Sequence, residues 1–436
     1  MQHKNNAMET TQFKIPKGLM EKSKKGFKEW ASLSLNKRIK KLSKVTSLLD
    51  NENNRIVETL KREIDMDREE AKKSTKKTCE LVKGVLSLSK DALKETQTDH
   101  GDYVNIKTYK PHGTVLSIVA WNHPVMVTFR SIIPALVSGN SVIIKPSEYT
   151  YQLGKVFSDI FSKMDLPEGT VQVVNGGRET RKELVKDENV DMVFFTGNSN
   201  NAISVYENCA PYLKKLVIEG SSKDIMIVDS NKKEDEMVDI ITNNFLRHSG
   251  QLCSSVRFIY LPKDNIQTFC KKIRDKMREL TSNSAKRYVY LNQDVKKLTD
   301  LYNDAIYKGA RVVFEKRTKR NFGPTVLTNI NEKMLVEYED FFGPLLLIKT
   351  FASQSELLNE LNKSYFGLNM SYWTNDVNKA IEISKNVKVG TFTVNMMPRT
   401  DYSYTWHGVK FSGLGYTLGK EGLREFTYIQ NLRIKK

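Results

Sequence analysis

The sequence predicts an α/β fold that contains parallel β-sheets in two successive blocks. The first observation is a series of short apolar runs separated by helical segments, which is the pattern of βαβ units with buried strands. The second is that this series pauses near Cys253 and then resumes. The third is the length, because 436 residues exceed what one hydrophobic core usually organises.

Residues 19 to 94 are predicted to form helices. Apolar residues recur at helical spacing in RIKKLSKVTSLLDNENNRIVETLKREI, with a break at the polar DNENN. After this segment, Val104 and Ile106 alternate with polar residues, which is typical of a strand at a solvent-exposed edge. The last stretch, LREFTYIQNLRIKK, alternates in the same way and is expected to pair with that edge strand.

The apolar runs between these segments are predicted to be buried strands. In the first block the runs are TVLSIVA, SVIIKP, VQVVNGG, MVFFTG, KLVIEG and DIMIVDS. In the second block they are VRFIYL, ARVVFE, LLLIKTF and GTFTVN. The chain contains no GxGxxG fingerprint and no internal repeat.

The net charge of +18 raises nucleic-acid binding as an alternative function. The excess lysines are, however, mixed with acidic residues at helical spacing, as in EKSKKGFKEW and EEAKKSTKK. There is no zinc-finger spacing, no aromatic RNA-binding motif and no long basic arm. The charge is therefore interpreted as solvated helix faces, and a nucleic-acid partner is not expected.

The four cysteines, Cys79, Cys209, Cys253 and Cys270, show no CxxC spacing and no paired histidines. Neither a metal site nor a disulfide framework is expected, and free thiols are typical of a reducing compartment. No apolar run reaches the length of a membrane span, and MQHKNNAMETTQFKIPKG lacks the apolar core of a secretory signal. We therefore expect a cytoplasmic protein without a membrane partner.

Polar residues follow several of the predicted strands. Asn122 follows TVLSIVA, Lys145 ends SVIIK, and Glu219 ends KLVIE. FFTGNSN is a strand that runs into a helix start, which suits a phosphate group. Because open parallel sheets bind ligands at the carboxyl ends of their strands, we expect a site there, and we assign Cys253 of SGQLC to the same kind of position.

These segments resemble the motifs of the aldehyde dehydrogenase superfamily, in order, from about Pro111 to the C-terminus. The matching stretches are AWN (120–122), PALVSGNSVIIKPSE (134–148), FTGN (195–198), EGSSK (219–223), GQLC (250–253), EDFFGP (339–344) and TWHGVKFSGLG (405–415). Each motif is weak by itself, and their shared order and spacing make the resemblance specific.

The resemblance implies a catalytic role for three residues. Cys253 would attack the aldehyde carbonyl as a thiolate, since the thiol itself is a poor nucleophile. The side-chain amide of Asn122 and the backbone N–H of Cys253 would bind the resulting oxyanion. After hydride transfer to the nicotinamide, Glu219 would activate the water that hydrolyses the thioester.

The resemblance also implies a dinucleotide site and no metal. Lys145 and Glu148 match the groups that bind the adenosine ribose, and a carboxylate there favours NAD over NADP, although NADP remains possible. The other residues expected to contact the cofactor are Trp121, Ser147, Thr196, Gly197, Asn198, Asp340 and Phe342. Asp340 would hold the nicotinamide ribose, and Phe342 would lie beside the nicotinamide ring.

Several residues depart from the family pattern. Asp340 is one methylene shorter than the usual glutamate, and Trp406 replaces a phenylalanine of the substrate wall. Small residues also differ, because Asn198 and Ala202 stand where serine and glycine are usual, and Ser221 and Ser222 replace two glycines. Ser131 stands where relatives often have lysine.

The resemblance implies two doubly wound, Rossmann-like domains and a small β oligomerisation arm. Residues 1–93 and 112–219 would form the cofactor-binding domain and residues 220–411 the catalytic domain. Residues 94–111 and 427–436 would form an arm that joins subunits into a homodimer or homotetramer, because an exposed edge strand needs a partner.

The leading hypothesis is an NAD(P)-dependent oxidoreductase that converts an aldehyde or semialdehyde to the carboxylic acid. One alternative is an acyl-CoA-forming or reductive relative, against which Glu219 argues. The other is an inactive member of the same fold that serves as a binding protein.

Overall fold

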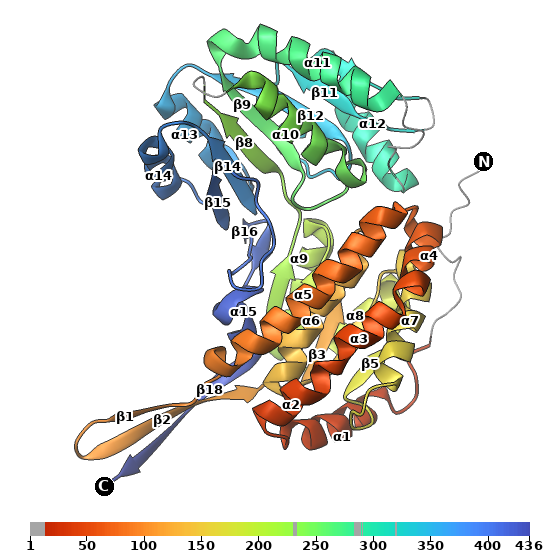
Figure 1. The fold of residues 1–436 in the computed structure, drawn as a ribbon, viewed down its shortest axis with the longest axis vertical. Helices are drawn as coiled ribbons and strands as arrows, with labels where there is room; N and C mark the ends of the chain where they lie inside the picture. The colour runs from red at the N-terminus through yellow and green to blue at the C-terminus, as the bar shows by residue number, and fades with distance from the viewer. Residues whose placement is uncertain (1–13, 230–232, 283–288, 290, 319–320) are drawn as a thin grey trace. The chain divides into compact units, whose positions relative to one another are not determined.

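A computed structural model describes residues 14–229, 233–282, 289, 291–318 and 321–436. The chain divides into two compact units. Unit 1 comprises Met1–Glu219, Thr400–Trp406 and Leu414–Lys436, and unit 2 comprises Gly220–Arg399 and His407–Gly413. The predicted α/β fold is confirmed, and each unit is described separately below (Figure 1).

The predicted helical character of residues 19 to 94 is confirmed. The helices are α1 (Leu19–Ala31), α2 (Leu35–Leu42), α3 (Lys44–Asn51), α4 (Asn53–Ile64) and α5 (Arg68–Ala92). Two of them begin at capping side chains. Ser34 accepts a hydrogen bond from the Lys37 N–H, and Asp67 accepts from the N–H groups of Glu69 and Glu70. The indole of Trp30 is fully buried and donates to the Leu136 carbonyl at 2.7 Å, which fixes α1 against α6 (Pro124–Ser138).

The main sheet of unit 1 is parallel and doubly wound. Its strands are β3 (Thr114–Ile118), β4 (Ser141–Lys145), β5 (Val171–Val173), β6 (Met192–Thr196) and β7 (Lys215–Glu219), with the short β17 (Gly413–Leu414) at one edge. The helices between them are α6 (Pro124–Ser138), α7 (Tyr151–Ser162), α8 (Arg178–Lys186) and α9 (Ser199–Cys209). The spatial order β7-β6-β3-β4-β5 places a switch point between β3 and β6, where ligands bind in such sheets.

The main sheet of unit 2 repeats this arrangement. Its strands lie in the order β10-β11-β12-β9-β8-β14-β15. They are β8 (Asp224–Val228), β9 (Val256–Pro262), β10 (Arg311–Glu315), β11 (Thr325–Thr328), β12 (Leu345–Phe351), β14 (Asn369–Trp373) and β15 (Thr391–Val394). The connecting helices are α10 (Glu234–Leu246), α11 (Ile266–Ser282), α12 (Asn292–Tyr307), α13 (Gln354–Lys363) and α14 (Val377–Lys385).

Both faces of the unit 2 sheet are buried, which explains the continuous apolar runs. Ile225 and Ile227 of β8 belong to the core cluster on one face, while Met226 and Val228 belong to the cluster on the other. A sheet covered on both faces needs apolar residues at every position rather than at alternate ones. Buried polar residues also occur, and three of them, Asn369, Ser371 and Thr374, lie on or beside β14, where the sequence pattern predicted no strand.

One edge of the unit 2 sheet differs from the predicted parallel arrangement. β10, predicted from ARVVFE, pairs antiparallel with β11, and β11 in turn pairs parallel with β12. The connection from β10 to β11 contains only residues 316–324, which is too short for the helical crossover that parallel strands require.

The predicted pairing of the C-terminal stretch with the strand near Val104 is confirmed. β18 (Thr427–Lys435) runs antiparallel to β2 (Tyr103–Pro111), and β1 (Thr96–Asp99) pairs with the other side of β2. These three strands form a ribbon that projects from the rest of unit 1 (Figure 1). β18 leaves apolar side chains exposed, among them Leu432 and Ile434.

Over the described residues, the helices are all either too short or too polar to cross a membrane.

Candidate active site

The polar residues predicted at strand ends in unit 1 all lie along one edge of its sheet. Asn122 follows β3, Lys145 is the last residue of β4, Thr196 is the last residue of β6, and Glu219 is the last residue of β7. Because all four strands are parallel, their carboxyl ends meet at the same edge. Asn122, Lys145 and Glu219 are each less than a tenth exposed, which is unusual for polar side chains without a structural or functional role.

Glu219 lies at the centre of a buried group of donors. Its Oε2 accepts an ion-paired hydrogen bond from Nη2 of Arg130 and a second bond, of 3.1 Å, from the Thr196 hydroxyl. Its Oε1 contacts the hydroxyl of Thr417 at 2.8 Å. A buried carboxylate is tolerated only when it is paired and hydrogen-bonded, and this one is both.

Lys145 and Glu148, the pair expected from the resemblance to bind a ribose, lie close together. Nζ of Lys145 donates to the Pro146 carbonyl at 3.0 Å and lies 3.8 Å from Oε2 of Glu148. Burial lowers the pKa of Lys145 to about 8, while the nearby Glu148 opposes this shift. The carboxylate of Glu148 is about half exposed, so it remains accessible to a ligand hydroxyl.

A second cation, Arg181 of α8, lies in the field of the same carboxylate. Burial lowers the pKa of Arg181, and the charge of Glu148 acts in the opposite direction. Nη2 of Arg181 also donates to Oδ1 of Asn201, at 3.2 Å, on α9. Sequence reasoning missed Arg181, because RETRKELVK reads as an ordinary charged helix.

The other cofactor residues predicted in unit 1 lie at starts of helices or in loops. Ser147 caps the short helix η1 (Glu148–Thr150) by accepting from the Tyr149 N–H. Asn198 caps α9 by accepting from the Asn201 N–H at 2.8 Å, so the replacement of serine by an amide preserves the cap. Trp121 meets the ring of Tyr149 edge-on at 6.5 Å.

Glycine is required at position 197. A Cβ there would lie 2.6 Å from the ring of Phe195, within the turn that joins β6 to α9. The small side chain leaves the backbone accessible directly before the amino end of α9, which is an arrangement that suits a phosphate group. Ala202, the other substituted position, is buried within α9.

The placement of Cys253 corrects the sequence interpretation. The thiol was expected at the carboxyl end of a strand, but it lies in the loop before the amino end of β9. This loop follows α10 and the short helix η3 (Arg247–Gly250). A helix of 13 residues, and not a strand, therefore precedes the loop that carries the thiol.

The chain before Cys253 turns through three successive residues with positive φ. They are His248 (φ 49°), Ser249 (φ 53°) and Gly250 (φ 68°), and two of them are not glycine. Left-handed conformations in such residues are uncommon and concentrate at functional sites. A Cβ on Gly250 would lie 2.8 Å from the Gly343 carbonyl, so the GQLC loop packs closely against EDFFGP.

Arg257 is hydrogen-bonded to the backbone of the loop that carries the Cys253 thiol. Its fully buried guanidinium donates through Nη2 to the carbonyl oxygens of Gly250 and Leu252, the residues on either side of Gln251. Burial lowers the pKa of Arg257 to about 10, whereas the charges of Asp224 and Cys253 act to raise it. Arg257 therefore places a positive charge near the sulfur and fixes the backbone that carries it.

The other three thiols are placed as expected for ordinary packing residues. Cys79 lies on α5, Cys209 on α9 and Cys270 on α11. Burial raises the pKa of Cys79 to about 12 and the pKa of Cys209 and Cys270 to about 11. A thiol in such a setting stays protonated and is a poor nucleophile.

Asp340 is engaged by two partners within unit 2. Its Oδ2 accepts from the hydroxyl of Ser221, and its Oδ1 pairs with Nζ of Lys297. Two departures from the family pattern, Ser221 for glycine and Asp340 for glutamate, are therefore in direct contact. Ser222, the third departure, donates to the buried Asp224, whose pKa is raised by burial to about 7.

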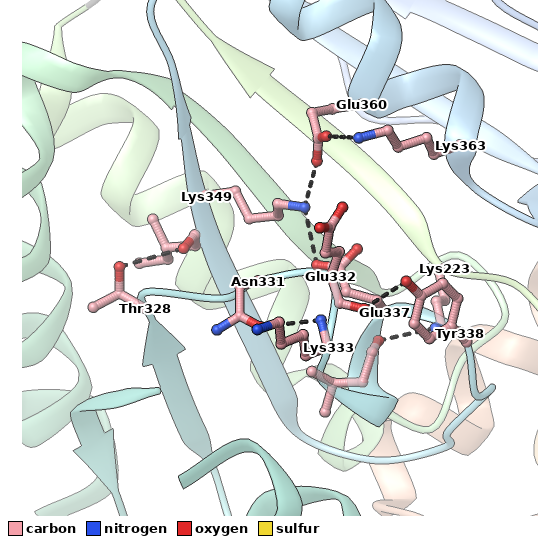
Figure 2. Close-up of polar contacts among 12 residues, drawn as sticks. Lys223, Thr328, Asn331, Glu332, Lys333, Glu337, Tyr338, Lys349, Glu360 and Lys363 are labelled. Carbon is pink, nitrogen blue, oxygen red and sulfur yellow. Dashed lines mark hydrogen bonds and ion pairs between the residues drawn. The ribbon is translucent and has the colours of Figure 1, made fainter. Parts of the chain in front are cut away.

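The segment that carries Asp340 and Phe342 is anchored by two further lysines (Figure 2). Lys349 of β12 lies between two carboxylates, 2.9 Å from Oε1 of Glu337 and 2.6 Å from Oε2 of Glu360. Nζ of Lys223 donates to the Val336 carbonyl at 3.0 Å, and burial lowers its pKa to about 7. These contacts fix the loop immediately before the EDFFGP motif.

Two of the remaining departures have clear structural surroundings. Ser131 is fully buried and shares a hydrogen bond of 2.6 Å with Ser117. Trp406 is buried and exchanges two backbone hydrogen bonds with Thr417. Unit 1 thus brings together Asn122, Glu219 and the residues proposed for adenosine, and unit 2 brings together Cys253, Asp340 and Phe342.

The chain contains two doubly wound, mainly parallel sheets, one with Glu219 and the Lys145–Glu148 pair at its carboxyl edge and the other with a loop thiol beside it. This arrangement is typical of the class of α/β proteins that includes dinucleotide-dependent enzymes. A family model described as the aldehyde dehydrogenase family matches residues 10–432. The chain belongs to this family.

The sequence identity to two individual relatives is between 28% and 31%. A 4,4'-diapolycopene aldehyde oxidase of Methylomonas sp is 31% identical over 326 residues, which cover 73% of this chain and 61% of that protein. A protein of Mycobacterium ulcerans named putative succinate-semialdehyde dehydrogenase [NADP(+)] 2 is 28% identical over 342 residues, or 74% of this chain and 65% of the relative. The chain thus spans less than two thirds of the length of these relatives.

The fold agrees closely with solved structures. A structure named lactaldehyde dehydrogenase superposes with a TM-score of 0.91 at 23% identity, covering 96% of this chain and 90% of the other. A structure described as an NADP-dependent enzyme of E. coli superposes with a TM-score of 0.90 at 21% identity and covers 99% of this chain and 94% of the other. At this level of identity the agreement concerns the fold.

Proposed function

We propose that the chain is an NAD(P)-dependent aldehyde dehydrogenase that oxidises an aldehyde or semialdehyde to the carboxylic acid. The observation that carries this proposal is the setting of Cys253 in a member of this family. Its loop combines left-handed residues with a buried arginine, whereas the other three thiols lie on helices with raised pKa values.

Each proposed step uses a group suited to it. The Cys253 thiolate attacks the carbonyl carbon, and the Asn122 amide with the Cys253 N–H stabilises the negative charge on oxygen. The bound dinucleotide supplies the hydride acceptor. Glu219 then takes a proton from water as that water attacks the thioester carbon, so that the thiolate leaves and the acid is released.

In this proposal the two units have different roles. Unit 1 binds the dinucleotide through Lys145, Glu148 and the start of α9, and unit 2 supplies the nucleophile. The groups on the Lys145 side of the site fit a ribose, because a lysine that donates and a carboxylate that accepts lie 3.8 Å apart and can bind adjacent hydroxyls. Relatives named as NADP-dependent support a choice between NAD and NADP rather than another cofactor.

A panel of aldehydes tests the proposal. Short aliphatic, long apolar, aromatic and carboxylate-bearing aldehydes are each incubated with NAD or NADP, and reduced nucleotide is followed by absorbance. We expect at least one aldehyde to be oxidised and its acid to be recovered in equal amount. Activity that requires coenzyme A would instead favour the acyl-CoA-forming alternative. No activity, together with tight and strongly salt-dependent DNA or RNA binding, would favour the binding protein.

The choice of cofactor is expected to depend on Glu148. Replacing Glu148 by Gln removes the charge that repels a 2′-phosphate and leaves Arg181 close by. The ratio of kcat/KM for NADP to that for NAD should rise about tenfold, which corresponds to about 1.4 kcal/mol. Glu179→Gln is the matched control, because Glu179 is an exposed carboxylate that also acts on Arg181. An unchanged ratio in Glu148→Gln would contradict this role.

We further propose that the three-stranded ribbon joins subunits of a homodimer or homotetramer. β18 is an edge strand with exposed Leu432 and Ile434 on one face, and charged residues at such an edge oppose strand pairing. Leu432→Lys combined with Ile434→Lys should lower the mass measured by light scattering to that of a monomer. Tyr307→Lys, at a 90% exposed position outside the ribbon, should leave the mass unchanged. A monomeric parent protein would refute this assignment.

The compartment proposed is the cytoplasm. All four cysteines are free thiols in the structure, which agrees with a reducing environment.

A further inference from the structure

The partner of Glu219 on helix α6 is a residue to which the motifs assign no role. Arg130 lies in the apolar run VMVTFRSIIPAL, is 3% exposed, and forms an ion pair through Nη2 with Oε2 of Glu219. The two side chains come from elements 89 residues apart in sequence. Glu219 is proposed to act as a base. An arginine paired with one of its oxygens therefore affects which oxygen can accept a proton.

The hydrogen bonds treat the two carboxylate oxygens differently. Oε2 accepts two, from Arg130 and from the Thr196 hydroxyl at 3.1 Å. Among the described residues, Oε1 has one such contact, with the Thr417 hydroxyl at 2.8 Å. That hydroxyl also lies 2.8 Å from the Trp406 carbonyl oxygen.

The Thr417 hydroxyl has a single proton, which increases the difference in the number of donors between Oε1 and Oε2. A hydroxyl donates one hydrogen, and neither an ionised Glu219 nor the Trp406 carbonyl can supply another. When Thr417 donates to the Trp406 carbonyl, Oε1 has no donor from Thr417 and is open to a proton. Oε2, in contrast, keeps both of its donors. The atom left to accept a proton is therefore Oε1.

We propose that Arg130 is a positioning residue that holds Glu219 by Oε2, so that Oε1 is the atom that accepts the proton from the hydrolytic water. The proposal rests on the proposed function. In this step the water oxygen bonds to the thioester carbon, its proton passes to Oε1, and the carbon–sulfur bond breaks with its electron pair leaving on Cys253. Arg130 touches neither the water nor the thioester, and it acts only through Glu219.

The hydrogen bonds of Arg130 also distinguish a positioning role from a role in packing alone. Nε of Arg130 is buried and has no hydrogen-bond partner among the described residues. The guanidinium therefore does not serve a general network of carbonyl groups, as that of Arg38 does with Val137 and Leu33. Among the described residues, this guanidinium donates to the carboxylate of Glu219.

The test is the lifetime of the acyl-enzyme in Arg130→Met. The full-length variant is mixed with a small excess of an aldehyde that the parent protein oxidises and with NAD(P). Reduced nucleotide is followed by stopped flow, and the acyl adduct is followed by quenching and intact-mass measurement. We expect one reduced nucleotide per site to form at the parental rate, and the adduct then to persist about 10- to 100-fold longer, as for a misplaced catalytic group. Hydroxylamine added after this turnover should release the adduct as hydroxamate without needing a base.

Two variants make the result specific. Arg38→Met removes a half-buried arginine that donates to the Val137 carbonyl of α6, and this variant should leave the adduct lifetime unchanged. Thr417→Val removes the hydroxyl on Oε1, and it should change the adduct lifetime by several-fold while the first turnover is retained. Thr417→Val decides the matter if Arg130→Met does not fold, because it alters only one hydroxyl.

The possible failures differ from one another. A parental adduct lifetime in Arg130→Met, or loss of the first turnover together with hydrolysis, would overturn the positioning role while leaving the proposed function intact. An unchanged lifetime in Thr417→Val would also overturn it if Arg130→Met is unfolded. A parent protein that reduces neither nucleotide with any aldehyde would overturn the proposed function itself.

Discussion

Replacing Cys253 by alanine should abolish the oxidation of an accepted aldehyde, with kcat lowered by about 10⁴-fold or more. No other thiol can substitute, because Cys79, Cys209 and Cys270 lie on helices where burial raises their pKa. Alanine leaves the carbonyl without a nucleophile but keeps the dinucleotide site, so NAD(P) should still bind. The measurement is the rate of reduced-nucleotide formation at saturating substrate, together with cofactor affinity by calorimetry.

Cys270→Ala is the matched control for this variant. Cys270 is a half-buried thiol of α11 in the same unit, and its removal should leave kcat within a factor of about two, as for a residue that only packs. Full activity in Cys253→Ala, or equal losses in the two variants, would remove Cys253 from the reaction.

Replacing Glu219 by glutamine should lower steady-state turnover by about 10²- to 10⁴-fold, the usual contribution of general base catalysis. Glutamine has the same size and still accepts hydrogen bonds from Arg130 and Thr196, but it cannot take a proton from water. The first turnover should survive, because attack by Cys253 does not need this base. We therefore expect one equivalent of reduced nucleotide per site, followed by very slow turnover.

Glu63→Gln provides the comparison. Glu63 is another buried carboxylate of unit 1, and it accepts from the N–H groups of Gln152 and Leu153 at the start of α7. Burial raises the pKa of Glu63 to about 6, and its hydrogen bonds to the start of α7 give it a structural role. Its amide variant should affect the melting temperature and leave the burst and the steady state unchanged. A Glu219→Gln enzyme that turns over normally would show that hydrolysis uses another base.

Much of the fold could be predicted because buried parallel strands have a distinctive sequence pattern. Runs such as SVIIK and DIMIV have apolar residues at successive positions rather than at alternate ones, and each forms a strand that is buried along its whole length. β14 could not be predicted in this way, because its polar Asn369 and Ser371 are buried through contacts from elsewhere. Asn369, for example, donates to Asp224, which lies 145 residues away.

The thiol loop shows how the position of a motif relative to a strand can be predicted wrongly. GQLC resembles the family's nucleophile motif, but the assumption that all site residues follow strands placed Cys253 at the wrong end of one. Unit 2 presents Cys253, Asp340 and Ser221 before strands β9, β12 and β8. Only the sheet topology distinguishes these positions from those of unit 1.

The hydrogen-bonding partners of the site residues could not be predicted from the sequence either, because these contacts join residues that are distant along the chain. Arg130 reads as one polar residue in an apolar helix, and Lys297 reads as one charge on an amphipathic helix. Their carboxylate partners, Glu219 and Asp340, are 89 and 43 residues away. A contact at such separation depends on tertiary structure, so spacing within the sequence carries no signal of it.

The most direct measurement traps the reaction on the protein itself. The Glu219→Gln variant is incubated with an accepted aldehyde and NAD(P), quenched, digested and analysed by peptide mass spectrometry. We predict an acyl group on Cys253 alone, formed only when both aldehyde and dinucleotide are present. An acyl group on another cysteine, or reduced nucleotide formed without any acylated Cys253, would contradict the account.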